Sequence, residues 1–409
     1  MKITILLITL LSSILSFSQL SVHVIPLTTN DLVYDGVTNK IYASIPSANG
    51  ANGNSIGVIN PDTYLLENTV FMGSEPDVMA IADNGQYIYV GFNGSSTVRR
   101  FNVALQTAEI QFGLGADTSG PNYAEDIEVM PGHPQTIAVS RRNIGLSPRH
   151  EGVAIYDDGV ARNITTPDHS GSNKIEFTSA NSLIGFNNES TEFGIRNLSV
   201  NDNGVTNVNL TRNVLSNFGL NFSYWSNRMY AHDGKVVDIS SSPFVIGQFS
   251  NVSGPAVFDT YYNKVAFASF NFSGNIEFKR YNPNTFLLTD SLNITQASGT
   301  VQNIITCGNG CYAFNSSDNK VIIIKDATLS TETVAAEISI YPNPTANYLN
   351  IKSSEIIETI QIIDVNGRII ENMVFENSRI SLADLETGIY MVRIKNANGN
   401  LTTEKIIKK

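Results

Sequence analysis

Acidic and amide side chains recur at matching points of this chain, each near the start of a run of apolar residues. The aligned positions are Asp31, Asp77, Asp126, Lys174, Asn221, Pro255 and Asn303. Carboxylate and amide oxygens suit a hard cation such as Ca²⁺, and they also hydrogen-bond to ligands rich in hydroxyl groups. We therefore predict that all of these residues except Pro255 form a ligand site. Within it, Asp31, Asp77 and Asp126 are the candidate Ca²⁺ ligands. Because Asp and Asn also cap turns before strands, a purely structural role stays open.

Basic residues gather in one segment of an otherwise acidic chain. The segment Ser140–Glu151 contains Arg141, Arg142, Arg149 and His150. Arginine can hold a carboxylate or phosphate with two parallel hydrogen bonds, and binding residues are often on loops. We predict a binding role for these four side chains, with a solvated charge cluster as the alternative.

The sequence predicts no catalytic residue. Gly53-Asn-Ser-Ile-Gly57 matches the spacing of a nucleophile elbow. That elbow needs a strand before the serine and a helix after it, whereas a Gly/Asn loop precedes Ser55. Trp225, the only tryptophan, is expected to pack in the core rather than to stack on a sugar.

The two cysteines, Cys307 and Cys311, flank a Gly308-Asn-Gly310 turn between two strand-like runs. Residues that face each other across such a turn can satisfy the Cα separation that a disulfide needs, and disulfides persist in oxidising compartments. A disulfide is therefore predicted, with a metal site disfavoured because no further cysteine or histidine pair lies nearby.

The elements that position these residues repeat along the chain. A turn followed by a strand recurs about every 45 residues, in the range expected of propeller blades. Its seven copies are Thr38–Ser44, Asn84–Val90, His133–Val139, Ala180–Gly185, Ser226–Ala231, Tyr262–Phe267 and Gly308–Ala313. Radial stacking lets four-stranded sheets bury both faces. We predict an all-β fold in which residues 19–326 form a seven-bladed β-propeller and Ser21–Leu27 completes the last blade.

One repeat also resembles a known group. The segments Gly73–Ile81 and Asp83–Val90 are similar to the repeats of YVTN-type, lactonase-like seven-bladed propellers. This resemblance implies an architecture, and fold alone does not imply function.

The end of the chain carries a second resemblance. Short alternating runs separated by Asn-Gly turns predict a small β-sandwich over residues 337–409, after a linker at 327–336. Four elements recur there in order: Tyr341–Pro344, Asp364–Arg368, Thr387–Tyr390 and a basic end. They resemble the C-terminal type A sorting domain of the type IX secretion system of Bacteroidetes. The motif residues are Tyr341, Pro342, Asn343, Pro344, Gly367, Gly388, Tyr390 and Lys405. The resemblance implies that the chain engages the type IX machinery and is exported across the outer membrane.

The start of the chain agrees with export. Lys2, the apolar run Ile3–Leu15 and Ser16-Phe-Ser18 predict a signal peptide over residues 1–18. The apolar run is shorter than the roughly 20 residues of a membrane-spanning helix, and no transmembrane segment is expected. We predict a protein that passes through the periplasm and is secreted or displayed on the outer-membrane surface.

Composition narrows the function further. The formal net charge is -11, which disfavours general binding to nucleic acid because phosphates need a basic surface. The sequence favours a monomeric, non-catalytic binding module for a surface ligand or protein, with Ca²⁺ as the one candidate cofactor. Two alternatives stay open. One is a metal-dependent, lactonase-like hydrolase that uses Asp31, Asp77 and Asp126, which are expected at the mouth of the propeller's central channel. The other is a structural surface protein.

Overall fold

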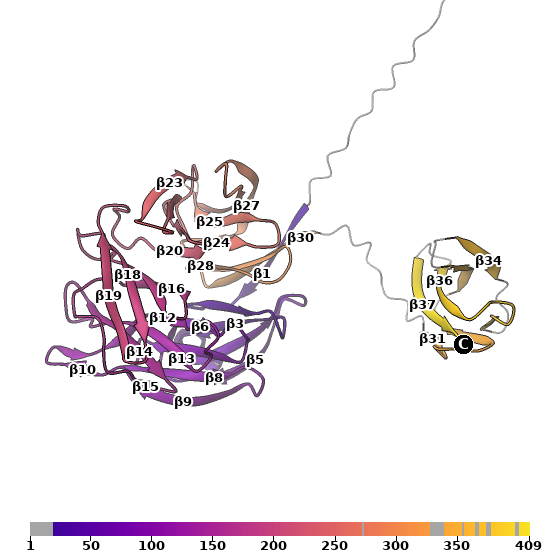
Figure 1. The fold of residues 1–409 in the computed structure, drawn as a ribbon, viewed down its shortest axis with the longest axis horizontal. Helices are drawn as coiled ribbons and strands as arrows, with labels where there is room; N and C mark the ends of the chain where they lie inside the picture. The colour runs from indigo at the N-terminus through magenta and orange to yellow at the C-terminus, as the bar shows by residue number, and fades with distance from the viewer. Residues whose placement is uncertain are drawn as a thin grey trace, which may run out of the picture. The chain divides into compact units, whose positions relative to one another are not determined.

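The computed structural model places two compact units, one ending at Ala327 and the other following it. Their colours run from indigo to orange and from orange to yellow, respectively (Figure 1). The structure describes residues 19–271, 274–327, 339–353, 356–364, 368–373, 378–396 and 401–409. The predicted signal peptide and nearly all of the predicted linker lie outside these ranges. Within them, no helix has the length and apolar character needed to cross a bilayer.

The described part of the first unit contains seven four-stranded antiparallel sheets. Six of the sheets are built from strands that are consecutive along the chain, and the first two of these contain β2 (Leu32–Asp35), β3 (Lys40–Ile45), β4 (Ser55–Asn60) and β5 (Leu65–Phe71), then β6 (Pro76–Ile81), β7 (Tyr87–Phe92), β8 (Thr97–Asn102) and β9 (Thr107–Gly113). The third and fourth contain β12 (Tyr123–Val129), β13 (Thr136–Arg142), β14 (His150–Asp157) and β15 (Val160–Ala161), then β16 (Lys174–Ser179), β17 (Ser182–Phe186), β18 (Ile195–Asn201) and β19 (Gly204–Thr211). The fifth and sixth contain β20 (Phe222–Trp225), β21 (Arg228–Ala231), β22 (Lys235–Asp238) and β23 (Phe244–Gln248), then β24 (Ala256–Asp259), β25 (Lys264–Phe270), β26 (Asn275–Tyr281) and β27 (Leu288–Ser298). The last sheet combines β28 (Val301–Thr306), β29 (Cys311–Ser316) and β30 (Lys320–Ala327) with β1 (Gln19–Pro26). A short helix, η1 (Ser47–Asn52), and the pair β10 (Ala116–Asp117) and β11 (Gly120–Pro121) lie in connections.

The sequence of each strand matches its depth in the sheet. Every residue of β7, Tyr-Ile-Tyr-Val-Gly-Phe, is buried, as expected of a strand covered on both faces. The outer strand β5 is largely exposed or half-buried. The backbones of adjacent sheets also approach closely, since a Cβ added to Gly91 would lie 2.7 Å from the Ala124 Cβ. Glycine in β7 therefore lets the next blade pack against it.

The sheets are arranged as a ring. The first strand of each sheet contacts the first strand of the next, and β28 contacts β2. A separate apolar cluster fills each junction; that between the first and last blades includes Ile41, Ala313 and Ile323. Full burial of an aliphatic side chain stabilises a fold by roughly 1.5–3 kcal/mol, so these junctions hold the ring together.

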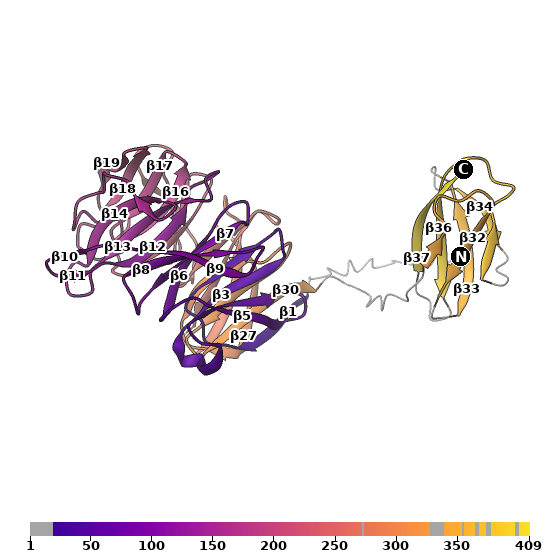
Figure 2. The same ribbon diagram turned by 90° about the horizontal axis from the view of Figure 1, so that it is seen from below.

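The two ends of the first unit close that ring. Strand β1 pairs with β30 in antiparallel register from Gln19–Ala327 to Pro26–Lys320, and both views show the two strands side by side (Figures 1 and 2). The predicted outer strand therefore forms, starting two residues earlier and ending one residue earlier than expected. Since the partners come from opposite ends of the unit, the ring is fastened non-covalently.

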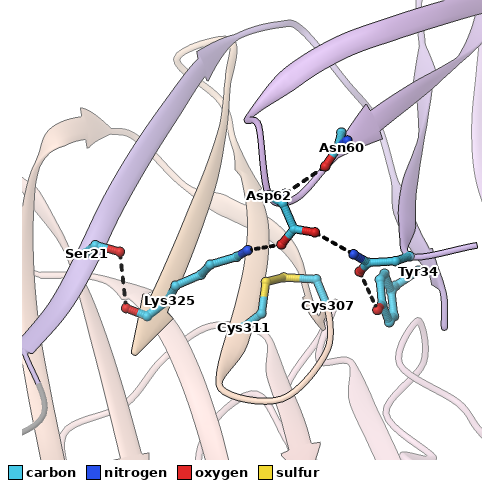
Figure 3. Close-up of a disulfide and its surroundings, with 8 residues drawn as sticks. Ser21, Tyr34, Asn60, Asp62, Cys307, Cys311 and Lys325 are labelled. Atoms are coloured by element: carbon cyan, nitrogen blue, oxygen red, sulfur yellow. Dashed lines mark hydrogen bonds and ion pairs between the residues drawn. A yellow bond between two sulfur atoms is a disulfide. The ribbon is translucent and has the colours of Figure 1, made fainter. Parts of the chain in front are cut away.

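A disulfide and an ion pair lie beside this closure (Figure 3). Cys307 and Cys311 are disulfide-bonded, with their Cα atoms 4.9 Å apart. The Lys325 ammonium on β30 donates to Asp62 at 2.5 Å, and the Asn39 amide donates to the same carboxylate at 2.7 Å. The last blade is thus tied to the turn between β4 and β5 of the first.

The second unit is a β-sandwich of two sheets. One has the order β31 (Ser339–Tyr341), β32 (Tyr348–Lys352), β35 (Arg379–Ser381), and the other β34 (Ile369–Met373), β33 (Ile357–Ile363), β36 (Gly388–Asn396), β37 (Leu401–Lys408). Their inward side chains share one core, which includes Leu349, Ile362 and Val392. The predicted Asn366-Gly367 and Asn398-Gly399 turns lie outside the described residues.

Candidate ligand-binding site at the channel mouth

The aligned polar residues lie together at one end of the ring. Each is at or near the start of the first strand of its blade. A cavity of about 300 Å³ runs through the channel there. Its lining contains all seven aligned positions: Asp31, Asp77, Asp126, Lys174, Asn221, Pro255 and Asn303. The repeat alignment therefore locates the channel. The chemistry of the site depends on the hydrogen-bond and ion-pair partners of each side chain.

Asp31 is used to join blades. One of its carboxylate oxygens accepts the Met79 backbone N–H, in the next blade, at 2.8 Å. The other accepts the Leu32 N–H at 2.8 Å and the Asn303 amide, from the last blade, at 2.5 Å. Burial nevertheless raises the pKa of Asp31 to about 6. These contacts fit the turn-capping alternative for this position.

Asp126 repeats this pattern between the third and fourth blades. It accepts the Ile175 backbone N–H at 2.9 Å and the Lys174 ammonium at 3.1 Å. Burial raises the pKa of this carboxyl, and the charge of Lys174 opposes that rise. Lys174 therefore serves as the internal counter-ion of the channel.

The three aspartates do not form a coordination sphere. Asp77 lies 3.5 Å from the Arg142 guanidinium, while Asp31 and Asp126 bind backbone N–H groups. In the ranges that the structure describes, no three His, Cys, Asp or Glu side chains are grouped so as to hold a metal ion. Ca²⁺ binding by these residues stays a prediction to which this arrangement lends no support.

Two carboxyl groups that sequence alignment did not select also line the channel. Glu128 and Glu176 lie two residues beyond Asp126 and Lys174 on β12 and β16, and both border the same cavity. Burial, and then the charge of Asp126, raises the pKa of Glu176 to about 8. Burial and the charge of Glu176 raise the pKa of Glu128 well above its usual range. The period-two alternation of a strand was the signal that could have found them.

A second, wider cavity of about 520 Å³ opens at the channel mouth. It shares Val78, Lys174 and Asn221 with the channel lining. Arg142 and Arg149 of the predicted basic segment also line it. The two cavities thus adjoin, and the basic segment contributes to the mouth.

The cations of the mouth are paired with carboxylates. Arg142 donates to Glu125 at 2.7 Å, and Arg149 binds Glu189 at 2.5 Å. The carboxylate of Glu189 also accepts the Arg149 backbone N–H at 2.9 Å. Because a second carboxylate oxygen holds the backbone, Arg149 and its counter-ion are fixed relative to each other.

The other two residues of the predicted basic cluster are not in the mouth. Arg141 precedes Arg142 on β13, so its side chain lies on the other face of that strand. There its guanidinium donates to the Gly152 carbonyl at 3.5 Å. His150 is only 1% exposed, and burial lowers its pKa to about 3. The sequence interpretation of His150 as a loop ligand is therefore corrected, because the residue begins a buried strand.

Trp225 also departs from expectation. The residue is 45% exposed, and its ring stacks on Phe258 with ring centroids 5.4 Å apart. The expectation of core packing is wrong because β20 ends at this residue, at the far end of the blade from the channel mouth.

In the second unit, Asn343 has a clear structural role. Its side-chain amide donates to the Lys405 carbonyl at 2.7 Å, and its oxygen accepts the Ile407 N–H at 2.9 Å. Tyr390 donates to the Glu386 carbonyl at 2.9 Å. The remaining described motif residues are Tyr341, Pro342, Pro344, Gly388 and Lys405, whereas Gly367 lies outside the described ranges.

Tyr341 and Lys405 differ from Asn343 in having their side chains turned to solvent. Tyr341 is 52% exposed, and Lys405 is exposed on β37. The motif therefore contains residues that maintain the sandwich and residues that are accessible to a partner.

Comparison with known proteins identifies the tail and the architecture. Residues 339–409 match the family described as the secretion system C-terminal sorting domain. The match indicates type IX export, to the medium or to the cell surface. No curated protein matches the chain in sequence.

Two solved structures resemble the propeller. Hydrazine synthase of Kuenenia stuttgartiensis matches with a TM-score of 0.55 and 12% identity, over 73% of this chain and 96% of that one. The β-propeller domain of Cps50 (Swd1) from Myceliophteria thermophila matches with a TM-score of 0.56 and 11% identity, over 75% and 98%. At such identities the likeness concerns the fold alone. The predicted all-β fold, a propeller followed by a small β domain, is confirmed.

Proposed function

We propose that the chain is a secreted, non-catalytic binding module whose channel mouth holds a peptide segment of a partner. The observation that carries this proposal is the 520 Å³ mouth cavity, in which paired cations and carboxylates surround amide groups. Asn188 and Asn221 supply the amides, and Phe218, 65% exposed, supplies an apolar contact. A rigid blade framework suits such a site, since little order is lost on binding.

The charge pattern favours a ligand that carries both signs. Removing only one partner of the Arg149–Glu189 pair would leave a partly buried charge uncompensated, which is costly. A peptide with one acidic and one basic side chain can exchange with both members at once. An aromatic or aliphatic side chain between them would contact Phe218.

The test is calorimetric titration of the purified full-length chain with tripeptides that contain an acidic, an apolar and a basic residue. Binding is expected for the chain, with at least a tenfold loss for Arg149→Ala. Arg212→Ala is the matched control, because Arg212 also pairs with a glutamate, at 3.2 Å, but does not line the mouth. Absence of binding, or equal loss in both variants, would reject the proposal.

A hydrolase of the lactonase-like kind is the second candidate, and Glu128 and Glu176 favour it. Adjacent carboxyl groups with raised pKa values are suited to general acid–base chemistry. The resemblance of the second blade to YVTN-type repeats supports the same grouping. Turnover of γ- and δ-lactones that is lost in Glu176→Gln, with the fold intact, would establish this function in place of simple binding.

For export, we propose passage through the periplasm and across the outer membrane as a monomer. The family match of the tail supports this route. Release into the medium and attachment to the surface are distinguished by fractionating cells that produce the full chain.

A further inference from the structure

We infer that the face of the propeller opposite the channel mouth carries a saccharide-binding site centred on Trp225. A cavity of about 250 Å³ lies there, and its lining includes Trp225, Arg228, Phe258, Asn263 and Asn284. The inference is independent of the proposed peptide site, because the two cavities share no lining residue.

The direction of the strands shows on which face of the propeller this cavity lies. The first strands start at the channel mouth, so β20 ends at the opposite face with Trp225. In an antiparallel sheet the turns after the first and third strands lie on that same face. Asn263 is in the turn between β24 and β25, and Asn284 is in the turn between β26 and β27. The site therefore lies across the junction of two adjacent blades.

Trp225 forms a supported aromatic platform. Its ring is within 10° of parallel to Phe258, and Phe258 is backed by Tyr230 at a centroid distance of 5.8 Å. One face of the indole is thus covered, while the residue as a whole remains 45% exposed. Stacking from behind holds the open face in place and reduces the ordering cost of binding.

The polar groups around the platform are already oriented. The Arg228 guanidinium donates to the Pro283 carbonyl at 3.0 Å and to the Asn284 side-chain oxygen at 3.2 Å. Asn263 and Asn284 are both exposed. Amides both donate and accept hydrogen bonds, and a guanidinium has five donors. No carboxylate is among the residues lining this cavity.

This combination matches the chemistry of a pyranose ring. A pyranose presents polarised C–H groups on its faces, which suit the negative face of an aromatic ring. Its hydroxyl groups project around the edge, where amide and guanidinium groups can reach them. The cavity is smaller than the roughly 300–1,000 Å³ typical of drug-sized ligands, which favours one sugar ring at a time.

Two neighbouring tyrosines extend the surface beyond a single ring. Tyr261 and Tyr262 are 57% and 38% exposed, and their rings meet edge to face at 4.7 Å. Both are in the same turn as Asn263. The site is therefore suited to one unit of a longer polysaccharide that continues across this face.

Fluorescence reports on this site directly, because Trp225 is the only tryptophan of the chain. The full-length chain is titrated with hexasaccharides of β-1,4-linked glucose, xylose, mannose and N-acetylglucosamine, with sorbitol as an acyclic control. We expect a saturable change in tryptophan emission with at least one hexasaccharide and none with sorbitol. Lack of any saturable change would overturn the inference.

Variants locate the binding. Asn284→Ala should weaken the fluorescence-detected affinity at least threefold, and Trp225→Ala should abolish binding in calorimetry. Phe244→Ala removes another exposed aromatic, 52% exposed on the outer strand of the same blade, and should bind normally. Arg149→Ala should also bind normally, which separates this site from the channel mouth. Unchanged affinity in both site variants would contradict the assignment.

Discussion

Glu176 shows how one side chain in the channel makes the stability of the propeller depend on pH. Its pKa is raised to about 8 in the folded chain by burial and by Asp126, so the folded protein keeps a proton that the unfolded chain releases near its ordinary pKa. Stability must then fall as the pH rises between those two values. Below this pH range the carboxyl group does not lower the free energy of unfolding, and above the range its ionisation lowers that free energy by the full amount.

We predict that Glu176→Gln is stabilising at high pH. The glutamine stays neutral, so its stability advantage over the natural chain should grow between pH 5.5 and pH 8.5, by on the order of 1 to 3 kcal/mol after allowance for solvent screening. Urea unfolding at both pH values measures it, with exposed Asp202→Asn as the control. An advantage that is equal at the two pH values would contradict the pKa assignment.

For single residues, the sequence predicted where a residue lies in the fold better than what its side chain binds. Asp31 and Asp126 align because the start of a strand is a recognisable local pattern. That their oxygens bind the N–H groups of the next blade depends on a neighbour about 48 residues away along the chain. His150 and Trp225 were misplaced for a related reason, because burial depends on where a strand begins or ends.

Strands and their junctions determine how the ring is closed. Strand β1 completes the last blade, and the Cys307–Cys311 bond lies in the first turn of that blade. Turn signals and apolar runs predicted both from the sequence. The pairing of Lys325 with Asp62 could not be predicted in this way, because the partners are 263 residues apart.

We predict a modest contribution from the disulfide. The loop that it closes is short, and chain entropy for about five residues gives about 2 kcal/mol. Reduction with dithiothreitol should lower the urea midpoint of the natural chain. The double variant Cys307→Ser, Cys311→Ser should unfold at that lowered midpoint and ignore the reductant. An unchanged midpoint of the natural chain on reduction would contradict the prediction, and the double variant, which lacks cysteine, controls for other effects of the reductant.

At the scale of the whole molecule, the chain consists of two compact units, and the second matches a secretion sorting domain. The propeller has its own blade-junction cores, and the tail has its own core around Leu349 and Val392. Repeat period and ordered motifs predicted the all-β fold, a propeller followed by a small β domain, because each unit carries its own pattern. The ligand was beyond such prediction, because each proposed site combines residues from more than one blade.

Removal of residues 337–409 should stop export. We predict that the truncated chain accumulates in the periplasm, because the sorting domain is lost while the propeller core is retained. Immunoblots of periplasm and medium measure this, with Arg212→Ala in the full chain as an export-competent control. Truncated protein in the medium would contradict the assigned role of the tail.

Hydrogen–deuterium exchange of the full chain, with and without a tripeptide of acidic, apolar and basic residues, tests the central claim most directly. Binding at the channel mouth predicts slower exchange in residues 140–151 and 186–190, and unchanged exchange around Trp225. Protection confined to other blades, or none at saturating peptide, would contradict a binding site at the mouth.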